Sequence, residues 1–129
     1  MTPTLIKNHV AGATVEAYRI VKHGSSDGAV VHGTNGTSAA LIGVTGELGA
    51  ESGERVDVVR AGIAEVTFGG TVSRGAPVTA TSTGKAVAAA PGGALNNYVI
   101  GFAEVDAVDG DIAPIMLAPS IMNGEGAPA

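Results

Sequence analysis

Short apolar runs of valine, isoleucine, leucine and alanine, separated by glycine-containing turns, make up the pattern of this chain. Several runs alternate apolar with polar positions, as strands with one buried face do. Twenty glycines are spread along the sequence and would interrupt most helices of ordinary length. The pattern therefore predicts an all-β protein. The expected strands are residues 15–22, 29–32, 39–44, 55–60, 63–68, 74–80, 86–90, 98–105 and 112–117.

Turn residues connect these expected strands. Asp27-Gly28 predicts a tight hairpin, because this pair supplies the positive φ that such turns require. Residues 34–37 predict a further turn. Ala61-Gly62 predicts either a turn between two antiparallel strands or a bulge within one strand. Pro77 is expected at the start or edge of a strand, since it cannot donate a hydrogen bond to a neighbour.

One strand–turn–strand pattern occurs twice. In residues 41–59 and again in 99–115, an apolar strand with one glycine leads to an acidic glycine turn and a second, alternating strand. Gly43 and Gly101 are expected to let these strands bend or pass closely. The repetition predicts a β-structure assembled from similar units, and neither copy contains a catalytic motif.

The two ends of the chain differ from its centre. Residues 1–13 hold a few apolar side chains among polar ones and are predicted to be an extended N-terminal arm that adds a strand to a partner; the alternative is plain disorder. Residues 14–118 are predicted to form one compact small barrel or sandwich, and residues 119–129 a flexible C-terminal tail. The arm residues predicted to contact a partner are Thr4, Leu5, Ile6, Lys7, Asn8 and Val10.

Composition narrows the classes of function. The 129 residues include two tyrosines, two phenylalanines and no tryptophan, so the core is modest and oligomerisation is expected. A net charge of -5 without a basic run argues against nucleic-acid binding. The absence of cysteine excludes disulfides and thiol chemistry. No stretch is apolar enough to span a membrane, and the N-terminus does not resemble a signal peptide.

Three candidate chemistries are weak when their context is considered. Gly24–Gly28 matches the Gly-x-Ser-x-Gly pattern of serine hydrolases, but a strand follows at once where that motif needs a helix. The histidines lack metal-ligand spacing and are interpreted as surface or rim residues. The aspartates near residue 109 lack the ligand series of a calcium loop and are interpreted as a solvated turn. These residues are His9, His23 and His32, and Asp106, Asp109 and Asp111.

Lys85 raises one further alternative. A lysine at a turn between small residues is similar to the modified lysine of lipoyl and biotinyl carrier domains. Gly84 departs from the residues that those domains place before the lysine, so an ordinary turn lysine is preferred. A β-rich adaptor that binds a carbohydrate or a host surface is a third alternative, disfavoured because only four aromatic residues are present.

Over residues 12–118 the chain resembles the head-decoration, or capsid cement, proteins of tailed bacteriophages. The order and spacing of several segments carry the resemblance. They are Arg19-Ile20-Val21-Lys22, Asp27-Gly28, Leu41-Ile42-Gly43-Val44, Gly53-Glu54-Arg55-Val56-Asp57-Val58, Gly62-Ile63-Ala64-Glu65-Val66, Gly75-Ala76-Pro77-Val78, Gly84-Lys85-Ala86-Val87, Ile100-Gly101-Phe102-Ala103 and Gly110-Asp111.

The resemblance implies a structural virion protein without enzymatic activity or cofactor. Such a protein is produced in the host cytoplasm and binds the outer surface of the expanded capsid, at junctions between major capsid protein subunits. There it stabilises the shell against the pressure of packaged DNA. The resemblance favours a homotrimer, with a dimer as the alternative, and gives the arm the role of reaching over the capsid lattice.

Overall fold

The computed structural model describes residues 3–33, 40–89 and 97–122, which form nine strands. The all-β prediction is confirmed for these residues. The strands are β1 (Pro3–Ala11), β2 (Ile20–His23), β3 (Ala29–His32), β4 (Leu41–Thr45), β5 (Arg55–Thr67), β6 (Pro77–Ala80), β7 (Ala86–Ala88), β8 (Asn97–Ala103) and β9 (Ile112–Met122). Within the described ranges there is no helix that could cross a membrane.

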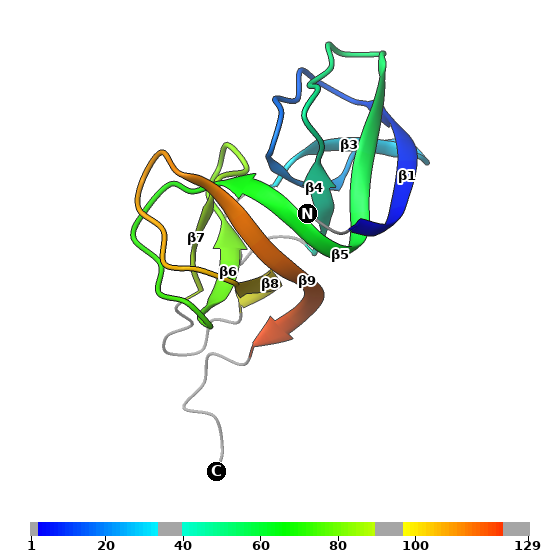
Figure 1. Cartoon of the computed structure of the whole chain (residues 1–129). Coiled ribbons are helices and arrows are strands. Elements are labelled where there is room, and N and C mark those ends of the chain that lie inside the picture. Colours follow the sequence, from blue (N-terminus) through cyan, green and yellow to red (C-terminus); the bar gives the residue numbers. More distant parts are fainter. Residues whose placement is uncertain (1–2, 34–39, 90–96, 123–129) are drawn as a thin grey trace.

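The first half of the chain folds into a five-stranded mixed barrel (Figure 1). Its strands follow the order β1-β3-β2-β4-β5, and pairing between β1 and β5 closes the barrel. β1 runs parallel to β3, whereas the other pairs are antiparallel. The interior is small and almost entirely aliphatic. It is formed by Ala11, Val15, Val21, Val30, Ile42, Ala50, Val56 and Val58.

β5 is one long strand that passes from the first half into the second. Residues 55–60 pair with β1 and β4, whereas residues 63–67 pair with β9. Gly62 lies between these parts with a φ of 95°, a left-handed conformation that glycine adopts without strain. Of the two readings of Ala61-Gly62, the single strand is therefore the correct one.

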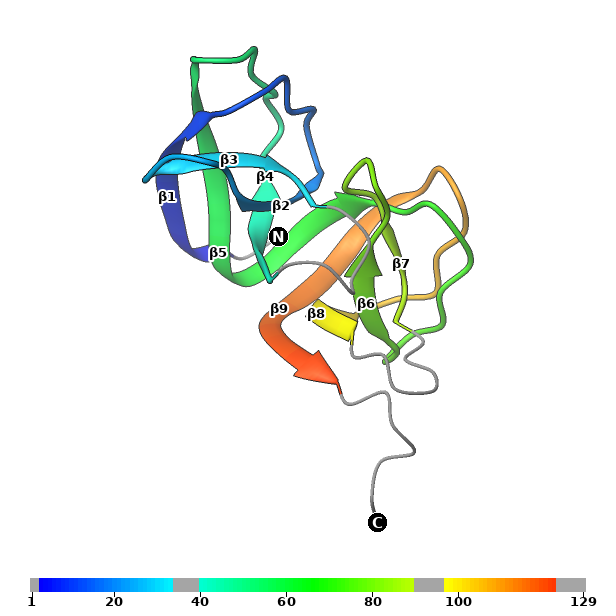
Figure 2. The same cartoon turned by 180° about the vertical axis from the view of Figure 1, so that it is seen from behind.

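The second half repeats the strand order of the first. Residues 63–67 of β5 are followed across the sheet by β9, β8, β6 and β7. A parallel bridge between Phe68 and Ala86 returns β7 to the end of β5, in the place of the parallel pairing of β1 with β3. Seen from behind, β6, β8 and β9 surround a second core beside the first barrel (Figure 2).

Hydrogen bonds confirm that the two halves are equivalent, with an offset of 57 residues. Val15 and Ala50 exchange two backbone hydrogen bonds of 2.9 and 2.8 Å. Val72 and Ala107, each 57 residues further along the chain, exchange two of 2.9 Å. The sequence predicted a repeat only for residues 41–59 and 99–115, whereas the structure extends it to nearly the whole chain.

Gly43 and Gly101 occupy equivalent strands and are both in close contact with a neighbouring strand. A Cβ atom at Gly43 would lie 2.5 Å from the carbonyl oxygen of Val59, and one at Gly101 would overlap the carbonyl oxygen of Met116. The expectation that these glycines allow strands to pass closely is confirmed. Equivalent glycine positions thus serve the same packing purpose in both halves.

The structure corrects three local predictions. The strand expected over residues 15–22 begins only at Ile20, because Tyr18 turns the chain with a φ of 58°. The N-terminal segment is not a free arm, since residues 3–11 form β1 and close the first barrel. Residues 119–122 belong to β9 and not to a tail. The turn predicted over residues 34–37 and the rest of the tail lie outside the described residues.

Candidate functional site

The predicted contact residues lie on β1, on the side of the first barrel. Leu5 and Ile6 are 53% and 52% exposed although they belong to a paired strand. Thr4, Lys7 and Asn8 are also exposed, and Val10 is half-buried. The barrel thus holds the β1 backbone and presents several of its side chains to solvent. These side chains form a candidate binding surface on a rigid support.

A groove runs beside Ile6 on this surface. It has a volume of about 380 Å³ and lies between β1, the start of β5 and the loop after β4. Leu48, in that loop, is 77% exposed at the margin of the groove. Sequence reasoning missed Leu48; the available signal was a single leucine within an otherwise polar and glycine-containing turn. We call Ile6, Leu48 and the groove between them the β1 surface.

A second groove lies on the other side of Ile6, where the two halves meet. Its volume is about 330 Å³, and its lining includes Tyr18 from the first half and Ile63 and Glu65 from the second. Both grooves are lined largely by apolar side chains with a few carboxylates. Neither brings together a nucleophile with a base. The arrangement suits contact with another macromolecule.

His9 lies inside the first barrel, which corrects the interpretation of the histidines as surface residues. It is only 3% exposed, with Nδ1 at 3.2 Å from the carbonyl oxygen of Gly28 and Nε2 at 3.3 Å from Nη1 of Arg60. A neutral ring that donates from Nδ1 and accepts at Nε2 satisfies both contacts. Burial lowers the pKa of His9, and the nearby Arg60 and Lys7 lower it further. His9 therefore has a structural role.

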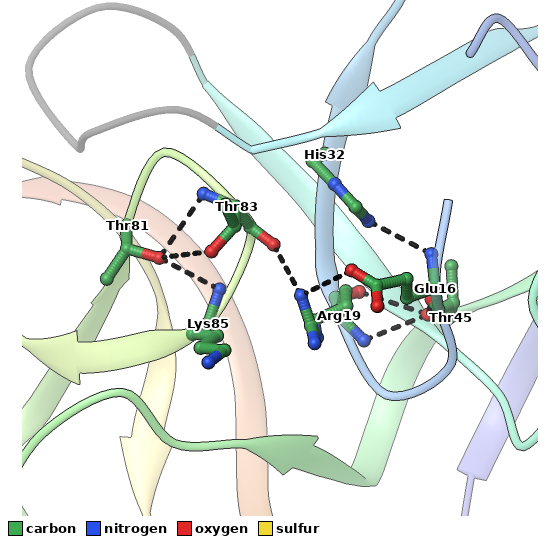
Figure 3. A network of polar contacts seen from close by, with 7 residues as sticks. All are labelled: Glu16, Arg19, His32, Thr45, Thr81, Thr83 and Lys85. Atoms are coloured by element: carbon green, nitrogen blue, oxygen red, sulfur yellow. Dashed lines mark hydrogen bonds and ion pairs between the residues drawn. The ribbon is translucent and has the colours of Figure 1, made fainter. Parts of the chain in front are cut away.

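Arg19 connects the two halves of the protein (Figure 3). Its Nη1 donates to the carbonyl oxygen of Thr83, in the turn between β6 and β7, at 3.0 Å, and forms an ion pair with Glu16 at 2.9 Å. The backbone N–H of Ile20 adds a 2.7 Å hydrogen bond to the carbonyl oxygen of Gly84. The turn between β6 and β7 is thus fixed against the first half.

His32 and Thr45 hold the chain on which Arg19 lies. The backbone N–H of Glu16 donates to Nε2 of His32 at 3.0 Å, which requires an unprotonated nitrogen. The Thr45 hydroxyl accepts from the backbone N–H of Arg19 at 2.9 Å and donates to the carbonyl oxygen of Glu16 at 2.7 Å. Burial lowers the pKa of His32, and the charge of Arg19 lowers it further.

The turn that carries Lys85 is packed against the first half and does not project from the protein. Thr83 and Gly84, just before the lysine, accept the hydrogen bonds from Arg19 and Ile20. The backbone N–H of Lys85 donates to the hydroxyl of Thr81 at 3.2 Å. A modifying enzyme needs an accessible turn, so this geometry does not favour the carrier alternative.

The other candidate residues lie in turns. Ser26 is part of the hairpin between β2 and β3, where no helix follows it. Asp106 accepts a 2.7 Å hydrogen bond from the backbone N–H of Arg74, and Asp111 accepts one of 3.0 Å from the N–H of Val108. Among the described residues, no three histidine or acidic side chains are grouped so that they could hold a metal ion.

Comparison with known proteins gives one informative match. No protein-family model and no curated protein sequence matches the chain. The crystal structure of the head fiber gp8.5 N base of bacteriophage phi29 is similar, with a TM-score of 0.66 and 19% sequence identity. The alignment covers 88% of this chain and 93% of that chain. At this level of identity the similarity shows that the two chains share a fold.

Proposed function

We propose that this protein is a structural component of a bacteriophage head and binds the outer surface of the capsid. The observation that carries the proposal is the shared fold with the phi29 head fiber base, which extends over 88% of this chain. The sequence resemblance to head-decoration proteins supports the same location. Two independent comparisons, one of residue pattern and one of three-dimensional structure, thus lead to phage heads.

Within this proposal, the protein binds expanded heads at junctions between major capsid protein subunits and stabilises the shell against packaged DNA. The β1 surface supplies the contact. Exposed apolar side chains on a paired strand, such as those of Leu5 and Ile6, gain free energy when a partner covers them. Thr4, Lys7, Asn8 and Val10 complete the proposed contact. Many copies on one shell, each as a proposed homotrimer, would add avidity to individually weak contacts.

Binding to purified heads tests the proposal. The protein is mixed with expanded and with unexpanded heads, and both are imaged by electron cryomicroscopy. We expect symmetric additional density on the outside of expanded heads only, at junctions between capsid subunits. Absence of density on both kinds of head would overturn the proposal, and equal density on both would overturn its dependence on expansion.

Matched variants test the contact surface. Ile6→Asp and Leu48→Asp place a charge on the β1 surface and should weaken head binding at least about tenfold each. Val108→Asp is the control, because Val108 is 53% exposed in a turn of the second half, away from β1. If the β1 variants bind heads as well as the control does, the contact lies elsewhere on the protein.

A further inference from the structure

One face of the second half carries a row of apolar side chains in cross-strand register. Met116 of β9 pairs with Ile63 of β5 on one side and with Phe102 of β8 on the other, and Phe102 pairs with Pro77 of β6. Phe102 and Met116 are 41% and 40% exposed, whereas Ile115, next to Met116, points into the core. We call Ile63, Met116, Phe102 and Pro77 the apolar row.

The first half contains the same row in the same register, and there it is mostly covered. Val59 pairs with Ile6 on one side and with Val44 on the other, and Val44 pairs with Ile20. Val59 is 8% exposed, and Val44 and Ile20 are fully buried. These three residues belong to the core cluster of the second half, although they lie on the outside of the first barrel. Equivalent faces therefore differ in what covers them.

One end of the second barrel provides the cover. Ala64, Ala80 and Leu117 belong to the same core cluster as the buried row of the first half. At Gly33, a Cβ atom would lie 3.0 Å from Leu41 of β4 and 3.1 Å from Ala80, so the two elements are in contact there. The chain thus packs the end of one barrel on the face of the other.

The equivalent end of the first barrel is basic and open to solvent. Lys7, His23 and Arg60 occupy the positions that Ala64, Ala80 and Leu117 hold in the second half, with the same offset of 57 residues. Lys7 and His23 are exposed, and Arg60 is half-buried above His9, with Nε donating to the carbonyl oxygen of Ile42 at 3.0 Å. We call Lys7, His23 and Arg60 the basic end.

Carboxylates flank the apolar row on the open face. Glu65 pairs with Pro114, and the backbone N–H of Glu104 donates to the carbonyl oxygen of Pro114 at 3.1 Å. Glu65 and Glu104 therefore lie on either side of Pro114, one row away from Met116. The open face combines apolar side chains with negative charge, while the basic end carries positive charge. The two surfaces are complementary in sign.

We propose that the apolar row and its flanking carboxylates form a docking face for the basic end of a second copy of this chain. The second copy would approach in the head-to-tail sense in which the second half already covers the first. Such an interface is heterologous, since it joins two different surfaces, and it can close into a ring or continue as a chain of copies. The inference concerns self-association and does not depend on capsid binding.

Sedimentation velocity over a range of protein concentrations tests the docking face without capsids. The wild-type protein should associate, and Phe102→Asp should weaken association at least about tenfold, as loss of a central contact does. Lys7→Glu should weaken it as well, and added salt should weaken the wild-type association. Val108→Asp is the matched control, and thermal unfolding confirms that each variant is folded.

Mixing two defective variants distinguishes the proposed arrangement from a symmetric one. Phe102→Asp retains an intact basic end, and Lys7→Glu retains an intact face, so a mixture should form a one-to-one dimer and nothing larger. A symmetric face-to-face interface would leave the Phe102→Asp chains monomeric in the mixture and overturns the head-to-tail proposal. Wild-type protein that stays monomeric at all concentrations, or that associates as well with Phe102→Asp, overturns the docking face itself.

Discussion

The two halves of this protein share one topology but differ at both the end and the outer face of the barrel. Interior positions agree, as with Val15 and Val72 or Ala50 and Ala107. The end of the first barrel holds His9 and Arg60, whereas the equivalent positions in the second half are buried and apolar. Packing within each barrel thus constrains the interior, while the surfaces follow whatever covers them.

The difference has a simple physical cause. The end of the second barrel is buried against the first half, where an unpaired charge would be costly, so aliphatic side chains occupy it. The end of the first barrel is open, and a histidine and an arginine can satisfy each other there with partial access to water. Four predictions, from the largest expected effect to the smallest, test this comparison.

Deleting residues 1–11 should have the largest effect, because it removes β1 and opens the first barrel. β1 pairs with β5 from Pro3 to Val10 and buries His9 and Ala11. We expect the first half to unfold, with loss of more than about 3 kcal/mol of stability. Circular dichroism and thermal unfolding measure the change. A truncated protein with unchanged unfolding would restore the free-arm prediction.

Adding a methyl group at the equivalent glycines should be the next largest effect. Gly101→Ala should cost about 3 kcal/mol and Gly43→Ala about 2 kcal/mol, because each Cβ would meet backbone of the neighbouring strand. Gly46→Ala is the control, since nothing lies within 4 Å of its Cβ position. Chemical denaturation gives the three free energies of unfolding. Equal values for all three variants would contradict the close-packing role.

Arg19→Ala should weaken the connection between the halves. The substitution removes the hydrogen bond to Thr83 and the ion pair with Glu16, at an expected cost of about 1–2 kcal/mol. Arg19→Lys is the comparison, because lysine keeps the charge but cannot reproduce the geometry of the guanidinium. Thermal unfolding should show both variants less stable, with a larger loss for alanine. Unchanged stability of Arg19→Ala would mean that aliphatic packing alone joins the halves.

Mild acid should destabilise the first half selectively. The pKa values of His9 and His32 are lowered from 6.5 by burial, so the unfolded chain binds more protons than the folded chain below that pH. Stability should therefore fall as the pH decreases through 6.5 towards the folded-state pKa values. All three histidines of the sequence lie in the first half.

Hydrogen exchange at individual amides locates the acid effect. Between about pH 7 and pH 5, amides of β1 and β3 should lose more protection than those of β8 and β9, after correction for the intrinsic exchange rate. The second half serves as an internal control because it lacks histidine. Equal loss of protection in both halves would show that the two histidines do not govern the response.

Much of the strand content followed from the sequence. Asp27-Gly28 marked a hairpin that the structure contains, with Gly28 at a φ of 80°. The strand containing Gly101 and its equivalent were identified as a repeat. The sequence misplaced the start of β2, because Tyr18 adopts a left-handed conformation that its residue type does not announce.

The candidate site was less predictable. Leu5 and Ile6 were selected because apolar side chains stood among polar ones, and both are exposed. Their support by β5 was missed, since pairing between strands about fifty residues apart leaves no local mark in the sequence. Leu48 was missed because an isolated leucine in a turn has no periodicity to mark it.

The sequence by itself determined the all-β class and the glycine-containing repeat, because alternation of side chains and positive φ are local properties of the chain. Only the tertiary structure decided that the repeat spans two barrels joined through β5, and that the outer row of one barrel is buried while that of the other is open. Burial depends on which element covers a face. That choice is made when distant strands pack together, after the local pattern has been satisfied.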